Sequence, residues 1–192
     1  MADRLRTFIA IEMDGAVKAR LKEARDLLRE HAGHIKWVDP ESAAHLTLYF
    51  MGETHADIVD AVADSIAKVC CSFEPFSFKV CGLGAFGGRR PRVLWCGVLE
   101  KAGILEKLHE DVVRSLEGFG FPADRRSFHP HLTLGRIRRP VSAPGLLDAL
   151  AANSDFDAGQ MVADHLTLFK STLTTAGALY EPLAELSLGG KT

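Results

Sequence analysis

The tetrapeptide His-Leu-Thr-Leu occurs three times in this chain, at residues 45–48, 131–134 and 165–168. An apolar residue at every second position is typical of a β-strand that buries one of its two faces. Because residues i and i+2 of a strand share a face, we expect the imidazole of His45 and the hydroxyl of Thr47 to lie together, opposite the two leucines. Each copy therefore predicts a strand with one imidazole and one hydroxyl on the same face.

The first two copies lie in segments that have the same order of elements. In each segment the histidine follows the start of the first strand, Thr7 or Val93, by 38 residues. Both segments predict a strand, a helix, the histidine-bearing strand, a second helix and a further strand. This repetition predicts two similar lobes, at about residues 1–85 and 90–192, within one domain that spans residues 1–192.

The pattern of apolar residues and turn residues gives approximate bounds for the elements. Strands are expected at residues 7–11, 45–51, 76–80, 93–98, 129–135, 162–169 and 179–188, and helices at residues 15–31, 55–71, 105–116 and 144–152. Residues 82–91 contain four glycines and are expected to form a loop between the lobes. This segment lacks the Gly-x-Gly-x-x-Gly pattern before a helix, so it does not predict a dinucleotide-binding loop.

Composition places the chain among globular proteins. Hydrophobic residues make up 47% of its 192 residues and charged residues 25%, and no run of 18 apolar residues predicts a transmembrane helix. The N-terminus is charged and lacks the apolar core of a signal peptide, which favours a cytoplasmic protein. The cysteines form no Cys-x-x-Cys pair and are expected to be reduced, largely buried thiols: Cys70, Cys71, Cys81 and Cys96.

Basic residues are unevenly spread although the formal net charge is only −2. One group consists of Arg89, Arg90 and Arg92, and a second of Arg125, Arg126, Arg136, Arg138 and Arg139. A local basic surface on a nearly neutral protein suits a short anionic ligand better than a long duplex. A solvated surface of ion pairs would give the same pattern, so both interpretations stay open.

Two imidazoles that face each other across a cleft suit the cleavage of a phosphodiester. The usual histidine pKa of about 6.5 makes both protonation states accessible near neutral pH, so one of His45 and His131 could accept a proton from water while the other protonates the leaving oxygen. The hydroxyls of Thr47 and Thr133 could donate hydrogen bonds to the other phosphoryl oxygens. This chemistry needs no metal, and the symmetric motifs do not say which imidazole is the acid.

Both motifs, with their flanking residues, resemble those of the 2H phosphoesterase superfamily. The similarity is closest to its RNA 2′,3′-cyclic phosphodiesterase branch, which is also described as the 2′-5′ RNA ligase family. The first motif reads His-Leu-Thr-Leu-Tyr-Phe-Met-Gly-Glu (residues 45–53), with Met51 where the family typically has leucine. The second reads Phe-His-Pro-His-Leu-Thr-Leu-Gly-Arg (residues 128–136), and residues 91–95 and 168–171 resemble further strands of the family.

The resemblance implies an α+β fold with two pseudo-symmetric lobes, each an antiparallel sheet with flanking helices, and an active-site cleft between them. It implies that an RNA 2′,3′-cyclic phosphate is hydrolysed to a 2′-phosphomonoester. His45 is then the proton donor to O3′, His131 is the proton acceptor that activates water, and Thr47, Thr133 and Arg136 bind the phosphate. Neither a metal nor a cofactor is implied. The expected ligands are RNA ends or small cyclic nucleotides, and the protein is expected to be a monomer without a membrane or an obligate protein partner.

Two other functions fit the same motifs. The first is the same chemistry on a different substrate, either another cyclic nucleotide phosphodiester or the formation of a 2′-5′ linkage between RNA ends, since the motifs contact only the phosphate. The second is a module that binds RNA or nucleotide without turnover, with residues 89–92 and 136–139 as its main contacts. Both motifs are intact, including their threonines, which favours an enzyme.

Two further histidines are expected to lie outside the catalytic pair. The repeat offset of 86 residues places His165 on Lys79, so its copy of the motif is interpreted as coincidence. His129-x-His131 resembles half of a zinc site, but no spacing singles out a third ligand among Asp124, Glu53 and His165. His129 is therefore expected to lie at the edge of the cleft. Three aromatic residues could stack on a base but are assigned to the core, although Tyr49 shares the parity of His45: Trp37, Tyr49 and Phe128.

Overall fold

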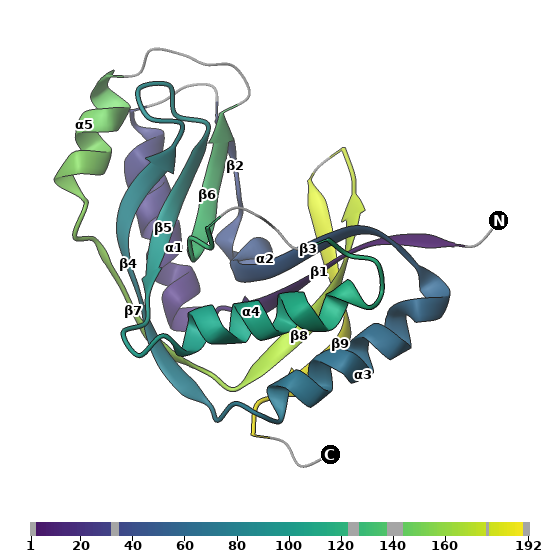
Figure 1. Ribbon diagram of the computed structural model, residues 1–192. Helices are drawn as coiled ribbons and strands as arrows, with labels where there is room; N and C mark the ends of the chain where they lie inside the picture. Colours follow the sequence, from purple (N-terminus) through teal and green to yellow (C-terminus); the bar gives the residue numbers. More distant parts are fainter. Residues whose placement is uncertain (1–2, 32–34, 123–126, 138–143, 176, 190–192) are drawn as a thin grey trace.

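A computed structural model of the protein describes residues 3–31, 35–122, 127–137, 144–175 and 177–189, with Pro144 described by its backbone alone. Strands in these ranges form two antiparallel sheets flanked by helices, which confirms the predicted α+β fold (Figure 1). Sheet A has the order β3 (His45–His55), β1 (Arg4–Glu12), β8 (His165–Leu173) and β9 (Ala178–Ser187). Sheet B has the order β2 (Ile35–Trp37), β6 (His131–Ile137), β5 (Val93–Leu99), β4 (Phe76–Phe86) and β7 (Asp157–Ala163).

The two sheets do not follow the two halves of the chain. β4 comes from the first half but pairs with β5 in sheet B, and β8 comes from the second half but pairs with β1 in sheet A. The two sheets therefore do not coincide with residues 1–85 and 90–192, the segments expected for the two lobes. Residues 87–92 are short enough to join β4 and β5 as an antiparallel hairpin, and this local pairing carries β4 across the expected boundary.

The exchange of strands preserves the predicted pseudo-symmetry. In sheet A the order is β3-β1-β8-β9, and in sheet B the corresponding order is β6-β5-β4-β7, with β2 added beside β6. The two histidine-bearing strands, β3 and β6, hold equivalent positions, and so do their neighbours β1 and β5. Any site built on both motifs therefore has one half on each sheet.

Helices pack on one face of each sheet and cover the main hydrophobic core (Figure 1). Sheet B is covered by α1 (Gly15–Arg29) and α5 (Pro144–Ala152), and sheet A by α3 (Val59–Cys70) and α4 (Ile104–Glu117). In α1 the carboxylate of Asp14 caps the helix by accepting a hydrogen bond from the backbone N–H of Val17 at 2.8 Å. Its buried residues recur at helical spacing: Val17, Leu21, Ala24 and Leu28. None of the described helices combines the length and apolar character needed to cross a membrane.

Two of the differences between the expected and the observed elements change how the chain is arranged in the sheets. The glycine-rich segment 82–91 is expected to be a loop, yet β4 continues through it to Phe86. Gly82 has a φ of +77° beside a register shift in the pairing with β5, so a β-bulge accommodates this glycine within the strand. The strand expected at 162–169 is in fact two strands, because the chain passes from sheet B to sheet A at Asp164.

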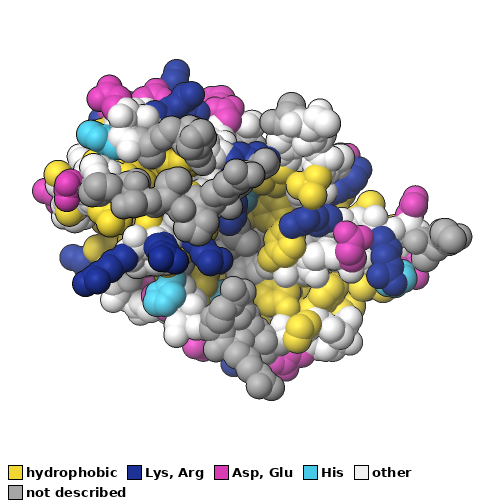
Figure 2. All heavy atoms as spheres, turned by 90° about the horizontal axis from the view of Figure 1, so that it is seen from above, with side chains coloured by type: hydrophobic (Ala, Val, Ile, Leu, Met, Phe, Trp, Pro, Cys, Tyr) yellow, Lys and Arg dark blue, Asp and Glu magenta, His cyan; other side chains and the backbone are white. Residues whose placement is uncertain are grey.

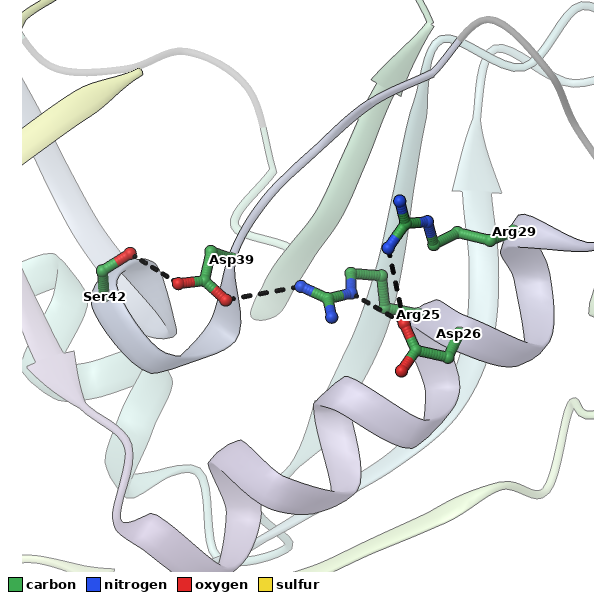
Figure 3. A network of polar contacts seen from close by, with 5 residues as sticks. All are labelled: Arg25, Asp26, Arg29, Asp39 and Ser42. Carbon is green, nitrogen blue, oxygen red and sulfur yellow. Dashed lines mark hydrogen bonds and ion pairs between the residues drawn. The ribbon is translucent and has the colours of Figure 1, made fainter. Parts of the chain in front are cut away.

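A short helix, α2 (Pro40–Ala43), leads into the first motif and is tied to α1 by polar contacts (Figure 3). The guanidinium of Arg25 donates a hydrogen bond to Asp39 at 3.3 Å, and the hydroxyl of Ser42 donates to the other carboxylate oxygen of Asp39 at 3.1 Å. These contacts hold α2, which directly precedes His45, against α1.

Candidate active site

His45 begins β3 and lies among aromatic rings on the face of sheet A that the helices leave open. Its imidazole centroid is 4.8 Å from that of Phe8 and 4.9 Å from that of Tyr180, which it meets edge-on. Burial in this apolar cluster lowers the pKa of His45 from 6.5 to about 4, against an opposing effect of the Glu12 carboxylate. Glu12 is its register partner on β1. The imidazole is therefore neutral at pH 7.

His131 begins β6 and is held in one tautomer. Its Nδ1 lies 2.7 Å from the backbone carbonyl oxygen of His129, and because a carbonyl can only accept, Nδ1 carries the proton. The lone pair of the neutral ring is therefore on Nε2. Burial lowers the pKa of His131, the carbonyl of His129 opposes this, and the positive charge of Arg136 lowers it further.

The two threonines share strand faces with the histidines, as their spacing predicts. Residues Leu46 and Leu132 are buried in the core, whereas both histidines and both threonines are half-buried. Thr47 lies opposite Ala10 on β1, and Thr133 lies opposite Trp95 on β5. Each sheet thus presents one imidazole and one hydroxyl on its open face.

Arg136 reaches the same face as His131 through a β-bulge. Five residues separate them, and on a regular strand an odd separation puts side chains on opposite faces. A register shift between Thr133 and Arg136 changes this parity, so Arg136 pairs with Val93, which shares a face with Trp95. The positive charge of Arg136 also acts on Tyr180 of sheet A and lowers its pKa. Burial has the larger, opposite effect, so the pKa of Tyr180 is raised overall.

Arg6, which the sequence did not single out, adds a second cation on sheet A. Its guanidinium carbon lies 4.7 Å from the ring centroid of Phe50, a cation–π contact. Its Nε is buried and has no hydrogen-bond partner among the described residues. Its charge acts on Tyr180, as that of Arg136 does. Tyr180 therefore lies near cations contributed by both sheets.

The expected parity of Tyr49 with His45 is wrong. A register shift between β1 and β3 falls between Thr47 and Tyr49, so Phe50 shares the open face of Phe8. Tyr49 is buried in the main core, and its hydroxyl donates a hydrogen bond to the backbone carbonyl of Pro122. The assignment of Tyr49 to the core is therefore confirmed.

The remaining residues considered as ligands or catalytic groups do not form a second site in the part of the chain that the structure describes. His165 lies at the start of β8, with Nδ1 2.6 Å from a carboxylate oxygen of Asp164. His129 lies beside His131 and lines the same cavity. Among the residues that the structure describes, no three His, Cys, Asp or Glu side chains are grouped as metal ligands would be. Asp124 lies outside the described residues, and so do four arginines of the second basic group: Arg125, Arg126, Arg138 and Arg139.

Basic and hydrophobic side chains are exposed together around the centre of the face shown in Figure 2. Two cavities lie beside the two histidines. The one beside His45 has a volume of about 180 Å³, and its lining includes Glu12, Phe169 and Tyr180. The one beside His131 has a volume of about 290 Å³, and its lining includes Phe86 and Trp95.

Two pseudo-symmetric sheets, each with a His-x-Thr strand, define the fold of a two-histidine phosphoesterase. The model of the 2′-5′ RNA ligase superfamily matches residues 14–174, and the chain belongs to this superfamily. A protein of Thermotoga maritima named RNA 2′,3′-cyclic phosphodiesterase is 34% identical over 187 residues, 97% of each chain. A protein of the same name from Aeropyrum pernix is 34% identical over 168 residues, 87% of this chain and 94% of its own.

Solved structures show the same fold. TT0787 of Thermus thermophilus superposes with a TM-score of 0.81 at 26% identity and covers 98% of this chain and 100% of its own. E. coli LigT complexed with 3′-AMP gives a TM-score of 0.77 at 23% identity, over 97% of this chain and 99% of its own. The family resemblance and the fold predicted from the sequence are therefore confirmed.

Proposed function

We propose that this protein hydrolyses RNA 2′,3′-cyclic phosphate ends to 2′-phosphomonoesters, with His45 and His131 as its general acid and base. One observation carries the proposal: each imidazole shares a strand face with a threonine hydroxyl, on equivalent strands of two pseudo-symmetric sheets. The relatives named RNA 2′,3′-cyclic phosphodiesterase support the choice of substrate.

In the proposed reaction the oxygen of a water molecule attacks phosphorus while His131 Nε2 accepts a proton from it. The P–O3′ bond breaks, His45 gives its proton to O3′, and the phosphate stays on O2′. His131 suits the role of base because its Nδ1–H already donates to the carbonyl of His129, which leaves the Nε2 lone pair free and stabilises the imidazolium that forms.

His45 suits the role of acid only when the phosphate is bound. In the free protein its pKa of about 4 keeps it neutral at pH 7. A phosphodiester anion beside the ring favours the charged form, as does the Glu12 carboxylate, so the substrate itself raises the pKa of the acid.

The remaining polar groups hold the phosphoryl oxygens. Thr47 and Thr133 can each donate one hydrogen bond, and the planar guanidinium of Arg136 can contact two oxygens at once. Arg6 has an unpartnered N–H in the described structure and supplies a further positive charge on the side of sheet A. Proton transfer and charge stabilisation are thus both supplied by side chains, and we propose that no metal is required.

An oligoribonucleotide that ends in a 2′,3′-cyclic phosphate tests the proposal. The protein is incubated with it in EDTA, and 2′- and 3′-phosphate products are separated. We expect a 2′-phosphate product, and a loss of about 10²–10⁴-fold in rate for His45→Ala and for His131→Ala. His55→Ala is the matched control, because His55 ends the same strand as His45 and pairs with Arg4.

Three results would contradict the proposal. A full rate for His131→Ala would show that His131 is not the general base. Loss of activity in EDTA would show that the reaction requires a metal. Tight nucleotide binding without any product would favour the non-catalytic binding module.

A further inference from the structure

The two motif histidines differ in the residue that lies opposite each of them on the neighbouring strand. His45 on β3 pairs with Glu12 at the end of β1, whereas His131 on β6 pairs with Gly97 on β5. The strand pairs β3–β1 and β6–β5 hold equivalent positions in the two sheets. At equivalent points, sheet A therefore places a carboxylate opposite the imidazole, and sheet B places no side chain at all.

Glu12 and His45 also share one cavity. Both residues line the cavity of about 180 Å³ on sheet A, and Glu12 is the one carboxylate among the described residues of its lining. The described residues form no hydrogen bond with the imidazole of His45, in contrast to the backbone carbonyl that holds His131. A fixed partner for a charged His45 ring is therefore supplied by charge across the cavity rather than by a backbone acceptor.

Lys18, in the first turn of α1, fixes the position of the Glu12 carboxylate. Its ammonium donates a hydrogen bond to Oε1 of Glu12 at 2.7 Å, and its side chain is 14% exposed, against 49% for that of Glu12. An ion pair of this kind contributes little to stability, but the ammonium offsets part of the negative charge. Oε2 of Glu12 has no partner among the described residues and can accept a hydrogen bond from a protonated ring or from water.

The other polar groups around His45 do not supply a negative charge. Tyr180 from β9 meets the ring edge-on, and burial raises the pKa of its hydroxyl, so this group is neutral at pH 7. The positive charges of Arg6 and Arg136 act on Tyr180. Among the charged side chains that the structure describes, Glu12 is the one whose charge favours the imidazolium of His45.

A general acid must hold a proton before the reaction, whereas a general base must not. We propose that Glu12, whose charge is set by Lys18, is a positioning residue that makes His45 rather than His131 the general acid. This inference rests on the proposed function. Burial opposes the imidazolium at both histidines, and at His131 the charge of Arg136 opposes it further, with no carboxylate opposite. The two different strand partners thus separate roles that the symmetric motifs leave open.

Glu12 acts by its charge and forms no bond with the substrate. The proton still passes from His45 to O3′, and the carboxylate stays ionised throughout. A bound phosphodiester adds a second negative charge, which leaves with the product. Glu12 remains, so it favours the return of a proton from water to the His45 ring before the next substrate binds.

Two substitutions with opposite effects on the charge test this inference. Glu12→Gln removes the negative charge and keeps the shape of the side chain, whereas Lys18→Met removes the ammonium that offsets it. Titration of the intact protein by NMR, with isotope-labelled histidine, measures the pKa of His45, and loss of a signal in His45→Gln assigns it. We expect Glu12→Gln to lower the pKa of His45 and Lys18→Met to raise it. A purely structural role gives no reason for opposite directions.

Hydrolysis of adenosine 2′,3′-cyclic phosphate between about pH 5 and 8 gives the effect on the reaction. On the alkaline side only the small protonated fraction of His45 is active, so we expect Glu12→Gln to lower kcat/KM at least about threefold there and Lys18→Met to raise it. Glu181→Gln is the matched control. Glu181 also accepts a hydrogen bond from a lysine, Lys170, at 2.9 Å, and because it follows Tyr180 on β9 it lies on the opposite face. It should change neither the pKa of His45 nor the rate.

The failure of this inference differs from the failure of the proposed function. If the wild type hydrolyses the cyclic phosphate but Glu12→Gln changes neither the pKa of His45 nor the alkaline-side rate, the inference is refuted and the proposed function stands. If Glu12→Gln and Lys18→Met move the pKa of His45 in the same direction, the ion pair acts through local structure, which also refutes the inference. If the wild type hydrolyses no cyclic phosphate, the proposed function fails, and with it the role of acid assigned to His45.

Discussion

Acidification should destabilise the folded protein through His45. Its imidazole has a pKa of about 4 in the folded protein, because of its burial among Phe8, Phe169 and Tyr180, and about 6.5 in an unfolded chain. Between these values the unfolded chain binds a proton that the folded protein does not bind. Stability is therefore lost as the pH falls from 6.5 towards 4. At about 1.4 kcal/mol for each tenfold change in proton activity, this interval corresponds to about 3 kcal/mol.

Urea unfolding followed by circular dichroism at several pH values from 7 to 4 measures this effect. The comparison is between the wild type and His45→Gln, which removes the titrating ring but leaves every other histidine in place. We expect the free energy of unfolding of the wild type to fall by about 3 kcal/mol more than that of His45→Gln over this range. Parallel curves, or a wild type that gains stability relative to the variant on acidification, would refute the reasoning.

Further predictions concern the reaction and sheet B. Burial lowers the pKa of both His45 and His131, so kcat/KM should follow a bell-shaped pH profile with its optimum below pH 6.5 and fall about tenfold per pH unit on the alkaline side; a plateau up to pH 8 would contradict this. Gly84→Ala should destabilise the protein by about 1–3 kcal/mol, because a Cβ would clash with Trp95, whereas Gly118→Ala, at an open helix end with φ of −63°, should be neutral or slightly stabilising; thermal unfolding of the pair checks this. Equal changes in the unfolding temperature for Gly84→Ala and Gly118→Ala would refute the close contact between Gly84 and Trp95.

The local pattern of apolar residues was sufficient to predict which side chains of the two motif strands face the core. The alternation of His-Leu-Thr-Leu depends only on the two-residue period of a strand, and the buried Leu46 and Leu132 confirm it. The two-residue alternation of faces does not continue beyond the tetrapeptide in either strand. A bulge after Thr47 turns Tyr49 into the core, and another after Thr133 brings Arg136 to the open face. A bulge changes parity without a strong local sequence signal, so only the pairing with a neighbouring strand reveals it.

The rest of the site depends on tertiary pairing. The exchange of β4 and β8 between the sheets is decided by long-range strand pairing, which repeat spacing does not specify. Tyr180 shows the consequence: it comes from β9, far along the chain, yet lies against His45 and near the charges of Arg6 and Arg136. Arg6 and Phe8 are two residues apart on β1, so the two-residue period of a strand already predicts that both side chains lie on the same face of sheet A.

Under the proposed mechanism, the electrostatics of the free site couple protonation of the acid to binding of the substrate. Burial keeps both imidazoles neutral, and the positive charge of Arg136 further disfavours protonation of His131. In the proposed reaction a bound phosphodiester would reverse this balance, because its negative charge favours an imidazolium beside it. The proposed acid is then charged mainly when a phosphate is in place to receive its proton. At His131 the carbonyl of His129 would take the corresponding role, because it already accepts a hydrogen bond from Nδ1–H and favours the imidazolium that the proposed reaction forms. The proposed base on sheet B thus has a fixed backbone acceptor, whereas the proposed acid on sheet A would depend on the substrate for its charge.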